Sequence, residues 1–208
     1  MALRKPPGLS REPGKARPRA FHVYSAQAVA NFCEVDLKTV HHWADRGKVA
    51  HFRTDGRHLR FRRNDVVRFL RAHGYPLPES LVKVRPVVAL ALSASMLEGA
   101  ALSLDELAKR LASRFSIRRH ASGISAVAHL VAESPDAVVV SLDDPSMGFP
   151  SAIAALKADA ATSWMIVAAV TGADIDASAQ RAAGADIVVP NQDLTKLSGE
   201  LARALAVP

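Results

Sequence analysis

From residue 87 onward, five short apolar runs alternate with longer stretches whose apolar residues recur at helical spacing. Runs this short have the length of buried strands, and a helix between successive strands is the connection that a parallel sheet requires. The strands are predicted at 87–92, 115–120, 137–142, 165–171 and 187–190. Residues 87–208 are therefore predicted to form an α/β domain around a doubly wound, five-stranded parallel sheet.

The stretches between these strands carry helix signals of their own. One helix is expected to begin at Ser103, where Glu106 completes a capping box. Others are expected at 124–132, 151–158 and 177–183. The last helix has a leucine stripe that we expect to pack against the sheet: Leu194, Leu197, Leu201 and Leu205.

The charge of the chain changes sign along its length. Residues 1–75 hold 16 Lys and Arg against 6 Asp and Glu, whereas residues 76–208 hold 11 against 14. Six of the eight histidines and eight of the eleven aromatic residues also lie in the first part. This contrast predicts two domains with different tasks, and a basic domain attracts polyanions, of which nucleic acid is the commonest.

The composition also indicates where the protein works. A single cysteine, Cys33, excludes an internal disulfide framework and a cysteine-based zinc finger. The first residues lack the apolar core of a secretory signal, and the longest apolar stretches, 86–97 and 164–173, are too short to span a membrane. We expect a cytoplasmic, nucleoid-associated protein without a membrane segment.

Two segments are expected to lack regular structure. Residues 1–20 hold four prolines, two glycines and six Lys and Arg, which predicts a flexible basic arm. Residues 76–86 contain three prolines and are predicted to be a linker. The domain boundaries follow: a DNA-binding domain over 21–75 and a second domain over 87–208.

Two short helices joined by a tight turn are predicted between these segments. Ser25 is the expected N-cap of the first helix, which buries Val29, Phe32 and Cys33. After a turn at Glu34, Asp36 is expected to cap a second helix over 36–46 that ends at Gly47. Its inward face is predicted to be Leu37, Val40 and Trp43. This is the helix-turn-helix arrangement.

The period of the pattern then changes from that of a helix to that of a strand. Residues 49–62 alternate around Asp55-Gly56, which predicts a β-hairpin. A third helix is expected to be capped by Asn64 or Asp65 and to bury Val66, Phe69 and Leu70.

These blocks resemble the winged helix-turn-helix of the MerR/excisionase superfamily. The resemblance runs from about residue 22 to residue 73 and includes Trp43-Ala44-Asp45-Arg46-Gly47-Lys48 and Arg53-Thr54-Asp55-Gly56-Arg57-His58-Leu59-Arg60-Phe61. It implies binding of double-stranded DNA, with the second helix in the major groove and the hairpin, as a wing over 49–62, against the minor groove and backbone.

The residue types agree with this implication, because ammonium, hydroxyl, imidazole and guanidinium groups bind base edges and phosphates. A basic hairpin alone is usually only a solvated surface, but beside a helix-turn-helix it favours DNA contact. The candidate DNA-binding residues are Lys38, Thr39, His41, His42 and Arg46 on the second helix and Arg53, Thr54, Arg57, His58, Arg60 and Arg62 on the hairpin.

Three other interpretations of this domain are weaker. His41 and His42 are adjacent, so their side chains diverge on a helix and do not ligate one metal ion. Cys33 lies on the buried stripe and is expected to be a core residue rather than a redox switch. The string Arg62-Arg63-Asn64-Asp65 has the Arg-x-x-Asp form of cyclic-dinucleotide receptors, but the hairpin-to-helix junction already accounts for it. We expect no metal and no cofactor.

The second domain resembles the receiver domain of response regulators, which has the flavodoxin-like fold. The resemblance is carried by residues 134–148, by Ala183-Gly184-Ala185-Asp186 and by Thr171, which matches the switch threonine of the family. It covers more than half of the chain.

The chemistry that the family uses is replaced in this sequence. Transfer of a phosphoryl group needs an aspartate nucleophile, carboxylates that hold Mg²⁺ and a lysine. The matching positions read Ser141, Ser93-Ala94 and Asn191, so phosphorylation is expected to fail. A shifted register that places Asp143 or Asp144 at the strand end is the alternative.

The sequence thus predicts a transcriptional regulator that binds double-stranded DNA through residues 21–75. Residues 87–208 are expected to form a homodimer or bind a partner protein through residues 177–206, and a small ligand at the carboxyl ends of the strands is possible in such a sheet. The alternative is a protein-interaction scaffold or nucleoid-associated adaptor tethered to DNA. A phosphorelay regulator is disfavoured by Ser141, and no nucleophile–base pair, metal cluster or phosphate-binding glycine loop in the sequence favours an enzyme.

Overall fold

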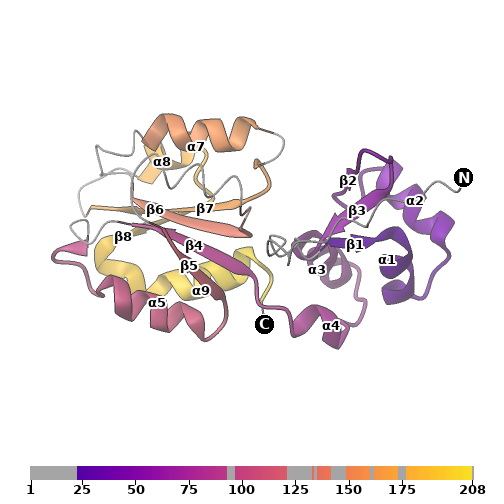
Figure 1. Cartoon of the computed structure of the whole chain (residues 1–208), viewed down its shortest axis with the longest axis horizontal. Helices are drawn as coiled ribbons and strands as arrows, with labels where there is room; N and C mark the ends of the chain where they lie inside the picture. The colour runs from indigo at the N-terminus through magenta and orange to yellow at the C-terminus, as the bar shows by residue number, and fades with distance from the viewer. Residues whose placement is uncertain are drawn as a thin grey trace, which may run out of the picture.

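Two bodies of different architecture lie side by side in the chain (Figure 1). A computed structural model describes residues 23–92, 97–120, 133, 135–141, 149–159, 162–172 and 177–207. The first body is helical with a small antiparallel sheet, and the second is an α/β body with a five-stranded parallel sheet. This confirms the predicted fold class. The basic arm at 1–20 and the expected helix at 124–132 lie outside the described residues.

The first body contains more elements than the sequence predicted. In chain order these are β1 (Val23–Ser25), α1 (Ala26–Cys33), α2 (Leu37–Asp45), β2 (Phe52–Arg53), β3 (Leu59–Arg62), α3 (Arg63–Ala72) and α4 (Glu79–Val82). The strands form an antiparallel sheet in the order β1-β3-β2, so the β2–β3 hairpin gains a third strand from the start of the domain. Helix α4 lies in the segment that was expected to be a linker.

The N-caps of α1 and α3 can be compared with the capping residues that the sequence predicts. The Ser25 hydroxyl accepts a hydrogen bond from the Ala28 amide at 3.1 Å, which confirms Ser25 as the N-cap of α1. The cap predicted for α3 is wrong. Strand β3 continues directly into α3, so Arg62 occupies the cap position instead of Asn64 or Asp65. The Asn64 amide instead donates to Asp136 in the second body, at 3.4 Å.

The turn between α1 and α2 depends on a left-handed residue. Glu34 has φ 54° and ψ 43°, and the next amide, that of Val35, donates to the Ala30 carbonyl at 3.0 Å. This geometry reverses the chain within two residues and sets α2 against α1. Glycine usually takes this position because it has no Cβ. At the end of α2, Gly47 does so, with φ 67°.

The core of the first body shows one error in the predicted inward face of α2. Val40 and Ala44 are buried, whereas Leu37 is 41% exposed. Trp43 is half-buried at the edge, with its ring centroid 5.0 Å from that of Phe69. The buried stripe of this short helix is therefore narrow, consisting of two residues four positions apart, and Leu37 falls outside it.

The second body is the parallel sheet with helices on both faces. Its elements are β4 (Val87–Ala91), α5 (Leu104–Ala112), β5 (Ser116–Arg119), β6 (Ala137–Ser141), α7 (Phe149–Ala158), β7 (Ile166–Thr171), α8 (Ala177–Ala182), β8 (Ile187–Pro190), a 3₁₀ turn (Asn191–Asp193) and α9 (Leu194–Ala204). The strand order β5-β4-β6-β7-β8 is that of the flavodoxin-like fold. Helices α5 and α9 cover one face, and α7 and α8 cover the other (Figure 1).

Apolar packing holds these layers together. The leucine stripe of α9 packs with Leu107 and Leu111 of α5 in the core on one face of the sheet, which confirms the predicted role of the stripe. On the other face, Ile153 of α7 packs with Val138 and Val140. The capping box at Ser103 and Glu106 is present as predicted. Within the described residues, no helix is long and apolar enough to cross a membrane.

Glu34→Gly is expected to stabilise the protein. A non-glycine residue in the left-handed region costs about 1–2 kcal/mol, and glycine returns about half of that gain through the entropy of the unfolded chain. We expect a net gain of about 0.5–1 kcal/mol and a rise in Tm of about 1–4 °C, measured by thermal unfolding. Glu34→Ala is the control, since it removes the charge but keeps the strain. An equal rise in both variants would assign the effect to charge.

Candidate nucleic-acid interface

The outer face of α2 presents polar and basic side chains. Lys38, His41 and His42 are exposed, and with Leu37 and Asp45 they line an open hollow along the helix. The sequence predicted the first three on this face but missed Leu37 and Asp45. The spacing of Val40 and Ala44 is the signal that could have placed Leu37 outside. A convex helix face with donors, acceptors and one apolar side chain matches what a major groove offers.

The β2–β3 hairpin has an unusual turn at its tip. The Arg57 amide donates to the Thr54 carbonyl at 2.7 Å, and the Thr54 amide donates to the His58 carbonyl at 3.1 Å. The turn lies at Asp55-Gly56 as predicted, but the left-handed residue is Arg57, with φ 58°. Arg57 is thus a charged residue in a backbone conformation that glycine usually takes, which makes its side chain a candidate for a functional role. Arg57 and His58 are both exposed at the tip.

An ion pair connects the hairpin to α2. The Arg53 guanidinium lies 3.4 Å from the Asp45 carboxylate, and its other nitrogen donates to the Arg57 carbonyl at 3.2 Å. Both side chains of the pair are largely exposed, so the pair adds at most about 1 kcal/mol to stability. Its effect is geometric, because it places the hairpin beside the end of α2, near the exposed Arg46.

Arg60 and Arg62 lie apart from this group, on the outer face of the sheet. Both are half-buried, and Arg60 donates to the Leu59 carbonyl at 2.9 Å. The Arg62 guanidinium lies over the Phe52 ring at 4.8 Å and over the Trp164 ring at 4.5 Å. Burial lowers the pKa of Arg62, and the nearby Asp65 carboxylate opposes that effect. The structure thus does not bring Arg62 together with the exposed basic residues.

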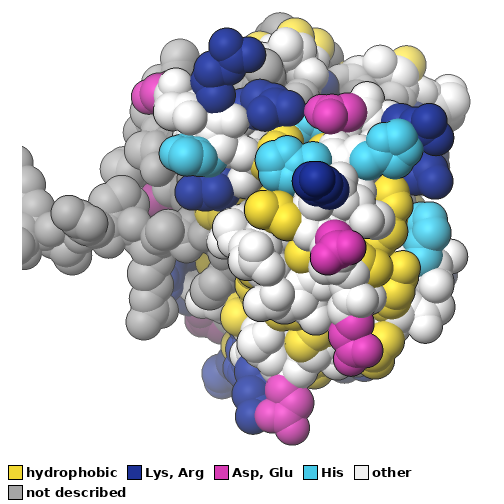
Figure 2. Space-filling model, turned by 90° about the vertical axis from the view of Figure 1, so that its right-hand side faces the viewer, with side chains coloured by type: hydrophobic (Ala, Val, Ile, Leu, Met, Phe, Trp, Pro, Cys, Tyr) yellow, Lys and Arg dark blue, Asp and Glu magenta, His cyan; other side chains and the backbone are white. Residues whose placement is uncertain are grey.

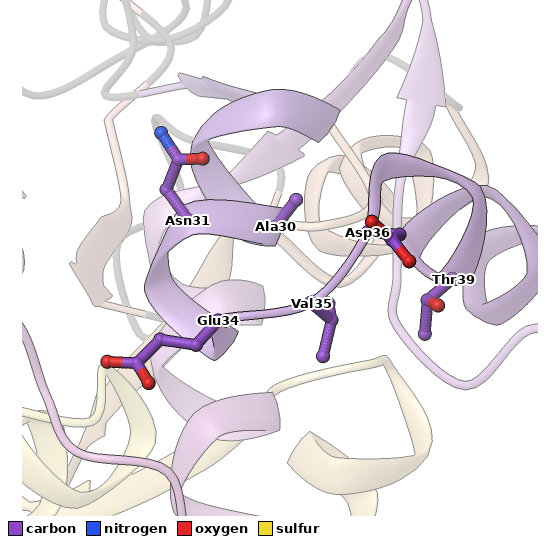
Figure 3. Close-up of a pocket in the computed structure, with 6 residues that line it drawn as sticks. All are labelled: Ala30, Asn31, Glu34, Val35, Asp36 and Thr39. Atoms are coloured by element: carbon purple, nitrogen blue, oxygen red, sulfur yellow. The ribbon is translucent and has the colours of Figure 1, made fainter.

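The basic and histidine side chains gather on one part of this face. Figure 2 shows most of the Lys, Arg and His side chains of this side in its upper half, with acidic side chains interspersed, whereas acidic and some Lys or Arg side chains lie in its lower part. The hollow at the α1–α2 turn has acidic residues: Glu34 and Asp36 line it with Ala30, Asn31, Val35 and Thr39 (Figure 3). Carboxylates repel phosphates, so this hollow bounds the basic surface. Thr39 lines the hollow, whereas the half-buried Thr54 lies in the hairpin turn.

The groups that suggested other chemistry have ordinary surroundings. Cys33 is buried, and burial raises the pKa of its thiol to about 11, so the thiolate is scarce at neutral pH. Among the described residues, no three His, Cys, Asp or Glu side chains are grouped so that they could hold a metal ion.

In the second body, the residues that match the receiver family's acceptor and switch positions lie at the ends of neighbouring strands. Ser141 is the last residue of β6 and Thr171 the last of β7, and each is 2% exposed. Asn191 follows β8 in the 3₁₀ turn. Ser93, Ala94, Asp143 and Asp144 lie outside the described residues. The two hydroxyls therefore share the carboxyl edge of the sheet, where such folds bind ligands.

Residues 177–206 form α8, the edge strand β8 and α9. The leucine stripe of α9 is fully used by the core of its own body. The outward side of α9 carries the ion pairs Lys196–Asp193 and Arg203–Glu200, each at 2.7 Å. Any partner of this surface would thus meet charged groups.

Comparison with known protein families agrees with the architecture of the first body. Residues 23–74 match a family model described as a helix-turn-helix domain. No curated protein matches the sequence.

The chain is also similar to solved response-regulator structures. One is the signal receiver domain of a DNA-binding response regulator protein (merR) from Colwellia psychrerythraea 34H, with 21% identity, a TM-score of 0.49, and coverage of 59% of this chain and 99% of that chain. A second is a DNA-binding response regulator of the LuxR family from Staphylococcus aureus, with 13% identity, a TM-score of 0.48, and coverage of 58% and 98%. The fold itself rests on the strand order of the sheet.

Proposed function

We propose that the protein is a transcriptional regulator that binds double-stranded DNA with sequence preference. Residues 21–75 are its DNA-binding domain, a winged helix-turn-helix of the MerR/excisionase type. Residues 36–46 enter the major groove, and the hairpin over 49–62 acts as the wing on the minor groove and backbone. The observation that carries the proposal is the exposure of Lys38, His41 and His42 on α2 beside Arg53, Arg57 and His58 on the hairpin.

The electrostatics support this orientation. Residues 1–75 contain ten more Lys and Arg than Asp and Glu, and this excess attracts the phosphate backbone over a Debye length of about 8–10 Å. The Asp45–Arg53 pair keeps the helix and the hairpin adjacent, so both can meet one duplex. Phosphate contacts by the hairpin supply affinity, and side chains on α2 supply specificity.

Residues 87–208 are proposed to be a receiver-like domain that assembles the protein rather than one that accepts a phosphoryl group. Ser141 stands where receivers have their aspartate, and a hydroxyl has neither the charge nor the nucleophilicity of a carboxylate. Thr171 stands at the switch position of the neighbouring strand. The surface of residues 177–206 is proposed to pair with a second copy or with a partner protein.

Genome-fragment selection tests the proposed function. Full-length protein at about 150 mM salt, where non-specific binding is weak, should enrich a defined DNA motif. The affinity for that motif should exceed the affinity for random DNA by at least about 10³-fold. If no motif is enriched, the alternative of a nucleoid-associated scaffold is favoured.

Lys38→Ala and His42→Ala should change which base pairs are preferred. Loss of one base contact costs about 1–3 kcal/mol at that base pair and little elsewhere. The measurement is competition binding with single-base variants of the selected motif. Lys48→Ala, which changes an exposed residue beyond α2, is the control. An equal loss of affinity on every sequence would contradict base contacts by α2.

Arg57→Gly should weaken binding to all DNA sequences without unfolding the hairpin. Glycine accepts the left-handed backbone of residue 57, so this variant removes the guanidinium and preserves the turn. The slope of log K against log salt should become shallower by about one unit for one lost phosphate contact. The control is Arg71→Ala, which removes one positive charge from the exposed side of α3. Alanine is used there instead of glycine because residue 71 lies in a helix. An unchanged slope for Arg57→Gly would exclude the hairpin tip from the interface.

Acetyl phosphate with Mg²⁺ should leave the protein unmodified, because Ser141 replaces the acceptor carboxylate. Intact-mass measurement and acid lability of any phosphate check this. Ser141→Asp provides the comparison. Stoichiometric, acid-labile phosphorylation of the unaltered chain would show that another carboxylate takes the acceptor role.

A further inference from the structure

The first half of α3 is buried where the two bodies meet. Arg63 is only 3% exposed although it is charged. Its Nε donates to the Leu81 carbonyl at 2.9 Å, and its Nη1 lies 3.5 Å from the Leu205 carbonyl. Burial lowers the pKa of Arg63, and the Asp136 carboxylate is the largest opposing influence. A buried guanidinium with carbonyl acceptors from two distant segments indicates a built junction.

Two further polar contacts extend this junction. The Asn64 amide donates to the Asp136 carboxylate, whose other oxygen accepts the Val87 amide at 2.8 Å. Arg68 donates to the Ala204 carbonyl at 2.6 Å. Apolar contacts accompany them, because Leu81 and Ala206 are buried within the core of the first body.

The hairpin takes part in the same junction through Arg62. Its guanidinium lies over Phe52 of β2 and over Trp164 of the second body. Phe52 pairs directly with Arg60 on β3, so Phe52, Arg60 and Arg62 share one face of the small sheet. Trp164 covers part of that face. A guanidinium–ring contact strengthens as water is excluded from it, and here both rings and the guanidinium are at least partly buried.

All the contacts from the second body come from one edge of its sheet. Asp136 immediately precedes β6, Trp164 lies two residues before β7, and residues 204–206 end the helix that runs back from β8. These points lie at the amino ends of the parallel strands. Ser141 and Thr171 lie at the opposite, carboxyl edge.

We propose that the second body positions the hairpin for DNA binding, and that Trp164 is the positioning residue. This inference rests on the proposed function. Strand β2 is only two residues long and lies at the edge of the three-stranded sheet, so few ladder hydrogen bonds hold the hairpin tip. A mobile tip loses conformational entropy when it meets a duplex. The ring of Trp164 fixes the Arg62 side chain, which in turn holds Phe52 and the hairpin at a set angle to α2. The receiver-like body is thus part of the DNA-binding geometry.

Substitutions at both sides of the contact test the proposal in the full-length chain. Trp164→Ala should lower affinity for the selected motif about threefold to tenfold, the equivalent of one guanidinium–ring contact. Trp164→Phe, which keeps a ring, should restore most of it. Arg62→Lys keeps the charge but loses the planar stack, so it should behave like Trp164→Ala. Arg71→Lys, at an exposed arginine of α3 outside the proposed interface, is the matched control and should bind normally.

Two readouts separate positioning from general damage. The Arg62 Nε–Hε resonance should carry a ring-current shift in the unaltered protein and in Trp164→Phe. In Trp164→Ala the shift should shrink to the part that Phe52 supplies; this measurement needs no DNA. Combining Trp164→Ala with Arg57→Gly should reduce affinity by less than the product of the single effects. In Trp164→Ala the hairpin is already mobile, so Arg57 contributes less to DNA affinity and its loss costs less.

The outcomes distinguish a failure of the proposed function from a failure of the positioning role of Trp164. If the unaltered protein selects no DNA motif, the proposed function fails. The Arg62 resonance still reports whether the Trp164 ring stacks on the Arg62 guanidinium. If the unaltered protein selects a motif but Trp164→Ala binds equally well, or the double variant loses the full product, Trp164 does not position the hairpin. A normal Arg62→Lys would overturn the proposal in the same way, even if Trp164→Ala failed to fold.

Discussion

The buried Arg63 guanidinium joins parts of the chain that are far apart in sequence. It binds the carbonyl of Leu81, in α4 at the end of the first body, and approaches that of Leu205, at the end of the second. A charge in this position is tolerated because its donors have acceptors and because Asp136 lies near. This side chain therefore ties the start of α3, which directly follows the hairpin, to the ends of both bodies.

The candidate interface combines a charged surface with a scaffold that limits where the charges go. On α2, a narrow buried stripe leaves most of the helix surface to solvent, which gives Leu37, Lys38 and His42 room to meet a partner. On the hairpin, the Arg53 guanidinium donates to the Arg57 carbonyl and pairs with the Asp45 carboxylate. The carboxylates of Glu34 and Asp36 at the helix turn mark where a polyanion would be repelled. The groups proposed to supply affinity and those proposed to supply specificity are therefore neighbouring but separate.

Patterns that are local in the sequence predicted the structure well. The alternation of apolar runs and helices predicted the parallel sheet, and Ser25, Ser103 and Glu106 predicted caps that the structure contains. Such signals succeed because the hydrogen bond or the buried face lies within a few residues. The predicted stripe of α9 is correct for the same reason.

Features made by distant segments were missed. Strand β1 exists because it pairs with β3, almost forty residues later, and α4 is anchored by Leu81 in a core formed by other elements. The sequence predicts Arg62 as a DNA-binding residue because it lies with the other basic residues on the hairpin. Its contact with Trp164 is not predicted, because Trp164 is about a hundred residues away. The exposure of Leu37 likewise depends on which neighbours α2 has, which the helical period alone does not specify.

The burial of Ala206 in the core of the first body has a consequence for how the protein folds during its synthesis. The helices of that body leave the ribosome first, but the residues that complete its core follow after the whole receiver-like body. At about 5–20 residues per second, more than a hundred residues take roughly ten seconds to translate. During that time the nascent first body lacks the Leu205 acceptor and the Ala206 contact. Its final stability is reached only when the second body has folded, so the two bodies are expected to mature as one unit.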